Sequence, residues 1–114
     1  MPSDNILRFT KHESVNVSHT AISGSGYISM AAYAAGLIWS PASNGGSTTL
    51  TWYHSADGVT FSPIGDGGGN AVTTTIAAST AEWYPLPTQL FASEWIGCIN
   101  NGSADFLAII QLKT

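Results

Sequence analysis

Few residues of this chain could perform acid–base or nucleophilic chemistry. Many serines and threonines accompany three histidines: His12, His19 and His54. Asp57 follows His54 by three positions, but a serine-type hydrolase also needs a presented nucleophile, and no Gly-x-Ser-x-Gly turn occurs. His54 falls on the same side of an alternating segment as Leu50 and Trp52, where a hydrogen-bonded strand residue is the simpler interpretation. We therefore predict that the protein is not an enzyme.

Carboxylates offer no better catalytic or metal site. Asp57 and Asp66 flank one predicted hairpin, as a glycosidase pair might, but each precedes a glycine, so we expect both to shape turns. The segment 66–70 supplies oxygen atoms without the alternating Asp/Asn spacing of a calcium loop. We predict no metal and no cofactor.

Cys98 is the one cysteine of the chain, so an intramolecular disulfide and a multi-thiolate zinc site are both excluded. It lies between Ile96 and Ile99, and no cationic residue is near it in sequence to stabilise a thiolate. We therefore predict that Cys98 is a small core residue.

The aromatic residues have two possible uses. They could form a stacking platform for sugars, or they could fill the core and an interface with another protein. We expect core or interface for most of them, with Tyr53 on the strand face opposite Trp52. The set comprises Trp39, Trp52, Trp83, Trp95, Tyr27, Tyr33, Tyr53 and Tyr84.

Alternation of apolar and polar residues predicts strands along most of the chain. A hairpin is expected over residues 48–64, with Asp57 and Gly58 as its two-residue turn. Residues 27–39 fit either a helical turn at 30–35 or a strand that ends at Pro41, and residues 88–92 fit a single helical turn. The remaining strands are expected at Ser14–His19, Ala71–Ala77, Trp95–Asn100 and Phe106–Lys113.

Short strands separated by glycine-rich turns predict an all-β fold, a single antiparallel β-sandwich of jelly-roll type. We assign this domain to residues 14–114. Residues 1–13 lack the alternation and are predicted to form an N-terminal arm. The arm contains most of the local positive character of the chain, from Arg8, Lys11 and His12.

Charge and hydropathy exclude several partners. Only 9% of residues are charged and the net charge is −4, so the chain cannot form the basic surface that nucleic acid requires. No apolar run is long enough to span a membrane, and the first residues do not resemble a signal peptide. We expect synthesis in a cytoplasm, with no nucleic-acid or membrane partner.

The segment from Gly36 to Lys113 contains a Leu37-Ile38 strand, residues 49–61 (TLTWYHSADGVTF) and an acidic glycine-rich turn at 66–70. A Thr/Val strand, the turn from Leu86 to Phe91 and a last apolar strand complete the pattern. In this pattern the segment resembles small virion proteins of tailed bacteriophages. The resembling proteins often have a basic residue before the Leu-Pro turn, where this chain has the segment 81–84.

This resemblance implies a non-catalytic capsid decoration (cement) protein on the outside of a phage head. The implied partner is the major capsid protein. We expect a homo-oligomer, a trimer that matches three-fold positions of the shell, with Arg8, Lys11 and His12 of the arm as the capsid contact. The alternative is a carbohydrate-binding module of a phage tail or baseplate, which would need two or more aromatic side chains exposed on one concave face.

Overall fold

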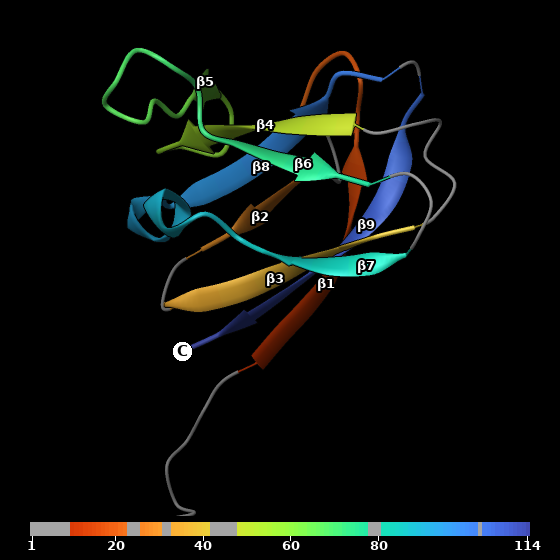
Figure 1. Cartoon of the computed structure of the whole chain (residues 1–114). Helices are drawn as coiled ribbons and strands as arrows, with labels where there is room; N and C mark the ends of the chain where they lie inside the picture. The colour runs from red at the N-terminus through yellow and green to blue at the C-terminus, as the bar shows by residue number, and fades with distance from the viewer. Residues whose placement is uncertain (1–9, 23–25, 31–32, 42–47, 78–80, 103) are drawn as a thin grey trace, which may run out of the picture.

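The computed structural model describes residues 10–22, 26–30, 33–41, 48–77, 81–102 and 104–114, and it consists of two β-sheets packed face to face (Figure 1). Sheet A contains, in spatial order, β1 (Thr10–Val17), β9 (Phe106–Lys113), β3 (Ala35–Ser40) and β7 (Glu82–Pro85). Sheet B contains β2 (Tyr27–Ser29), β8 (Trp95–Asn100) and β4 (Thr48–Ser55), followed by β5 (Ser62–Pro63) and β6 (Thr73–Ile76), which both pair with β4.

The order of the strands is that of a jelly roll. From β1 to β4 and again from β7 to β9, consecutive strands alternate between the two sheets. β5 and β6 pair with different parts of β4 and together occupy one strand position, so each sheet has four positions. All pairings between named strands are antiparallel. The predicted all-β sandwich of jelly-roll type is confirmed.

The core lies between the sheets and is formed by alternate residues of the strands. On β4, Leu50 and Trp52 are fully buried, and the Trp52 indole Nε1–H donates to Thr74 Oγ1 at 2.9 Å. Burial of the large apolar side chains is the main force that holds the two sheets together. The inward residues of the other long strands include Val15, Val17, Ile38, Ile96, Cys98, Ala108, Ile110 and Leu112.

β1 starts earlier than the sequence predicted. Residues 10–13, which we assigned to the arm, pair with the end of β9, from Thr10 with Lys113 to Glu13 with Ile110. Lys11 and Glu13 are on the same side of the strand as the buried Val15, but they lie at the margin of the core and are charged. The alternation of apolar and polar residues therefore did not indicate this part of the strand. The rest of the predicted arm, with Arg8, lies outside the described residues.

The connection after β4 is also longer than predicted. β4 ends at Ser55 and β5 begins at Ser62, so the two-residue hairpin turn at Asp57 and Gly58 is wrong. Side chains build the loop: Ser55 Oγ accepts the backbone N–H of Gly58, and Asp57 Oδ1 accepts those of Val59 and Thr60. Gly58 has φ +76°, the left-handed conformation for which glycine was expected there.

The structure decides one ambiguous segment and part of the other, because residues 31 and 32 of the possible helical turn lie outside the described residues. Residues 35–40 form a strand, as the Leu37-Ile38-Trp39 run favoured, and Thr88–Ala92 form one 3₁₀ turn, η2. Leu90 of η2 is fully buried and closes one end of the core. No helix in the described part of the chain is both long and apolar enough to span a membrane.

Candidate interaction face

The outer side of sheet A brings apolar residues of three strands into register. Trp39 on β3 is the cross-strand partner of Trp83 on β7 and of Ile109 on β9. Leu37, two residues before Trp39 on β3, pairs in the same way with Pro85 and Gln111. These residues point outward because the residues that alternate with them, such as Ile38 and Ile110, are buried between the sheets.

This surface is open to solvent. Leu37 is 39% exposed, Trp83 44% and Leu107 63%, while Trp39 and Ile109 are half-buried between them. We call these five residues the sheet-A face. Contiguous exposed apolar residues on a folded domain mark interaction sites more often than scattered ones do.

The edges of sheet A are unsuited to further strand pairing. On the β1 edge, the Lys11 ammonium and the Glu13 carboxylate form an ion pair at 3.1 Å on the inward side of the strand. On the β7 edge, Pro85 lacks an N–H for a sheet hydrogen bond. Inward charges and edge prolines are the features by which β proteins avoid edge-to-edge pairing. The apolar face is therefore the part of sheet A suited to a partner.

Two of the three predicted contact residues have partners within the fold. Lys11 pairs with Glu13 and its Nζ lies 5.9 Å from the centre of the Tyr33 ring. His12 Nε2 lies 2.7 Å from Gln111 Oε1, which places His12 at the border of the sheet-A face. Both residues belong to β1 and not to an arm, because they lie in register with Leu112 and Gln111 of β9.

The outer side of sheet B is covered by the chain itself. Tyr27 packs against Phe61 with ring centroids 5.2 Å apart, and edge-on against Trp95 at 5.7 Å. Between Tyr27 and Tyr53, β8 has Gly97, and a Cβ there would lie 2.8 Å from the Gly26 carbonyl oxygen. Of the described aromatic residues, only Trp83, which is on sheet A, is exposed. The rings of Tyr27, Phe61 and Trp95 therefore pack together on the outer side of sheet B.

The turn aspartates act on backbone geometry, as predicted. Hydrogen bonds from the backbone of Thr60 and Val59 and from the Ser55 hydroxyl lower the pKa of Asp57 to about 2. Backbone N–H groups of Gly68 and Asn70 lower the pKa of Asp66 in the same way. Each carboxylate thus stabilises its own turn, and no hydrogen bond or ion pair within the described residues joins the two.

The histidine and cysteine considered for catalysis are not assembled into a catalytic group. No hydrogen bond links His54 to Asp57 in the described part of the chain, and the Asp57 carboxylate is used by its own loop. Burial raises the pKa of the Cys98 thiol to about 12, in agreement with its expected place in the core. The described residues contain no group of three or more potential metal ligands of the His, Cys, Asp or Glu type.

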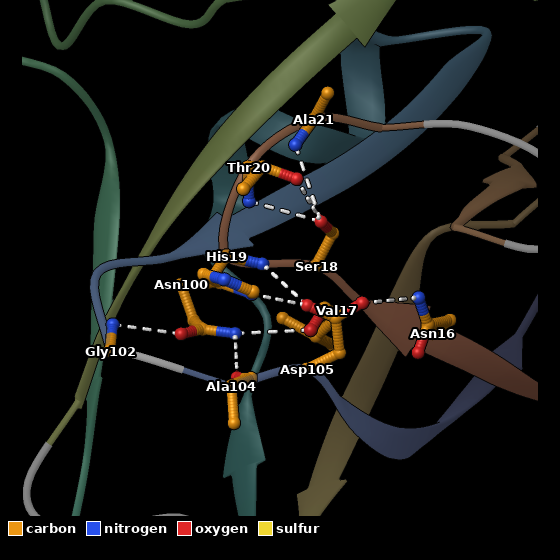
Figure 2. A network of polar contacts seen from close by, with 10 residues as sticks. All are labelled: Asn16, Val17, Ser18, His19, Thr20, Ala21, Asn100, Gly102, Ala104 and Asp105. Atoms are coloured by element: carbon orange, nitrogen blue, oxygen red, sulfur yellow. Dashed lines mark hydrogen bonds and ion pairs between the residues drawn. The ribbon is translucent and has the colours of Figure 1, made fainter.

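One polar network joins the two sheets at the end of β1 (Figure 2). The Asn100 amide donates to the carbonyl oxygens of Val17 at 3.0 Å and Ala104 at 3.2 Å, and its oxygen accepts the Gly102 N–H at 2.8 Å. Beside it, Asp105 Oδ1 lies 2.5 Å from His19 Nδ1 and accepts the His19 backbone N–H, and these two contacts lower the pKa of Asp105. Because the buried Asn100 amide is used within the fold, this network is structural.

Comparison of the chain with protein-family models, with curated proteins and with solved structures gave no match. The sheet-A face is the feature that sequence reasoning missed. Leu37, Trp83 and Leu107 each fall in an apolar stretch, but only the order β9–β3–β7 places them on one surface. The strand 106–113 could have indicated this face, because apolar residues occur on both of its sides although only one side lies against the core.

Proposed function

We propose that the protein is a non-catalytic capsid decoration protein, which binds the outside of a tailed-phage head through its sheet-A face. The observation that carries this proposal is the open apolar surface formed by Leu37, Trp83 and Leu107 around Trp39 and Ile109. Such a surface suits a broad protein partner, because removal of apolar area from water contributes about 25 cal/mol per Å² to association.

The shape of the surface favours a shell over a short peptide. The sheet-A face runs across three neighbouring strands, whereas strand addition would need the edges that Lys11, Glu13 and Pro85 occupy. The partner in this proposal is the major capsid protein, which presents a continuous outer surface. A trimer would engage three such sites at once and gain avidity of about 10²–10⁴-fold.

The resemblance to phage virion proteins and the jelly-roll order support the same proposal. Jelly rolls occur in viral capsid proteins and also in lectins, so the fold by itself does not choose between the two uses. The alternative, a carbohydrate-binding module, was expected to expose two or more aromatic side chains on one concave face. Among the described aromatics only the residue Trp83 is exposed, and the Tyr27, Phe61 and Trp95 rings pack together. A carbohydrate-binding module that uses exposed aromatic side chains therefore has less support than capsid decoration.

The test is occupancy of phage heads. Heads of the encoding phage that lack the protein would be mixed with the purified wild type or with the double variant Leu37→Ser, Leu107→Ser, then sedimented and quantified. We expect the double variant to lose binding. Val59→Ser is the matched control, because Val59 is 80% exposed and belongs to the loop over sheet B.

Two further measurements separate the parts of the proposal. Equal occupancy by the double variant would rule out the sheet-A face, and no binding by the wild type would rule out decoration itself. Sedimentation equilibrium of the free protein tests the trimer. A deletion of residues 2–9 leaves β1 whole, since this strand begins at Thr10, and tests whether the segment with Arg8 adds to binding.

A further inference from the structure

A hollow at one end of the sandwich lies where β4, β5 and η2 meet. Figure 1 shows η2 as the coiled ribbon at the left end of the molecule, beside the end of β2 and the start of β8. The hollow has a volume of about 310 Å³ and is lined by His54, Ser62, Pro63, Ile64, Gln89, Ala92 and Ser93. A second hollow of about 270 Å³ shares His54 and Ser62 and extends to the loop at Asp57 and Thr60. His54 therefore separates two adjoining depressions, away from the sheet-A face.

The ring of His54 is the one polar side chain of the described residues with a buried atom that lacks a partner. Its Nδ1 is buried and makes no hydrogen bond to any described group. A buried N–H without an acceptor is costly, so of the two neutral tautomers the one with its proton on Nε2 is favoured. Nε2 is not among the buried unpartnered atoms, so we infer that its N–H reaches solvent as a free donor beside the hollows.

The other polar groups around the first hollow are hydroxyls and an amide. Ser62 and Ser93 can each donate and accept, and the Gln89 amide has both a carbonyl oxygen and an NH₂ group. None of these three side chains makes a hydrogen bond to another described residue. No Asp, Glu, Lys or Arg lines this hollow, so it lacks the charge that would select an ionic ligand. Its apolar wall consists of Pro63, Ile64 and Ala92.

We propose that this hollow binds one ring of a neutral saccharide, through His54 Nε2–H, Ser62, Ser93 and Gln89, with the carbon face of the ring against Pro63 and Ile64. Sugar hydroxyls both donate and accept, which matches this set of groups. The volume is at the lower end of the range for small-molecule sites, so it suits a single ring. The site differs from the aromatic platform expected of a carbohydrate-binding module and is independent of capsid binding.

The test is a titration of the ¹⁵N-labelled full-length protein followed by NMR. The probes are the methyl glycosides of glucose, galactose, mannose and N-acetylglucosamine, each up to about 50 mM because a single-ring site is expected to bind weakly. We expect at least one probe to cause saturable shifts at Ser62, Gln89, Ser93 and the His54 ring nitrogens. Sodium acetate and sodium phosphate at the same concentration should leave these signals unchanged.

Variants assign the site. His54→Ala and Gln89→Ala should each weaken binding of the responding glycoside by about 3- to 10-fold, the loss expected for one hydrogen bond. Gln111→Ala makes the same chemical change on sheet A and should leave binding unaltered. Gln89 is exposed on η2, so its variant keeps the test valid if His54→Ala fails to fold.

Three results would overturn the proposal. They are the absence of saturable shifts for all four glycosides, shifts confined to residues outside the hollow, and stronger binding of either anion than of any glycoside. Because Gln89→Ala leaves the sheet-A face intact, head occupancy of this variant should equal that of the wild type. Failure of the saccharide site is thus distinguishable from failure of the decoration function.

Discussion

The outer sides of the two sheets are both rich in large apolar residues, yet the described part of the chain covers only that of sheet B. On sheet B, Ile22 lies over Gly97, and Phe61 of the loop after β4 packs on Tyr27. On sheet A, Leu37, Trp83 and Leu107 remain open to solvent. The difference shows that a strand's own sequence does not decide whether its outer side is available, because connecting loops can cover it.

The largest effect on stability should come from a substitution that displaces the segment covering the outer side of sheet B. In Gly97→Ala the new Cβ would lie 2.8 Å from the Gly26 carbonyl oxygen and 3.0 Å from Ile22 Cδ1, so backbone must move. We expect a loss of about 1–3 kcal/mol in the free energy of unfolding, measured by urea denaturation. Gly65→Ala is the control, since its Cβ would meet nothing nearer than 3.9 Å. Equal stability of the two variants would mean that the cover is loose.

A somewhat smaller effect is expected in the loop that carries Phe61. Gly58→Val places a β-branched residue at φ +76°, which should destabilise the protein by about 1–2 kcal/mol in the same measurement. Gly58→Asn should recover most of this loss, because asparagine tolerates the left-handed conformation. If valine and asparagine behave alike, contact with Trp95 and not backbone conformation governs this position.

The third effect depends on pH. Asp57 has a pKa of about 2 in the folded protein against 3.8 ordinarily, so its charged form contributes stability above pH 3.8 that is lost as the pH falls through about 2. Asp57→Asn removes this titration. Its urea midpoint should therefore fall less between pH 5 and pH 2 than that of the wild type. An identical fall would show that the hydrogen bonds of this carboxylate do not stabilise the loop over sheet B.

The smallest effect on stability should come from sheet A. Leu107→Ser changes a side chain in a residue that is 63% exposed, so the free energy of unfolding should stay within about 0.5 kcal/mol of the wild type. Head occupancy should fall in the same variant if the sheet-A face binds the shell. A large loss of stability instead would indicate that Leu107 packs within the fold, and the contrast between the two outer sides would fail.

The strands that alternation predicts well are those with one side in the core. Trp95–Asn100 and Phe106–Lys113 were predicted with their observed bounds, and the hairpin predicted from residue 48 begins with the strand Thr48–Ser55. The predicted burial of Cys98 is confirmed. β7 was not predicted, because its residues Glu82–Pro85 are exposed or only half-buried and show no inward pattern. Local sequence therefore identified the core but not the margins of the sheets.

The candidate sites were less accessible to sequence reasoning because both depend on contacts between distant segments. The sheet-A face needs β3, β7 and β9 as neighbours, and the hollow at His54 needs η2 to close against β5. His54 was assigned to the inner side of its strand, but the expected hydrogen bond is absent among the described residues. The position of a residue along a strand predicts the side of the sheet on which its side chain lies. Its hydrogen-bond partner, however, depends on tertiary structure.

The pairing of β1 with β9 has a consequence for synthesis of the protein. Among the described strands, β1 pairs only with β9, and β3 has only β7 beside it until residues 106–113 are made. A nascent chain on the ribosome therefore cannot complete sheet A before β9 has emerged, and such long-range pairing is slow to form. The sheet-A face is assembled at this step, so the surface proposed to bind the shell does not exist on chains that still lack β9.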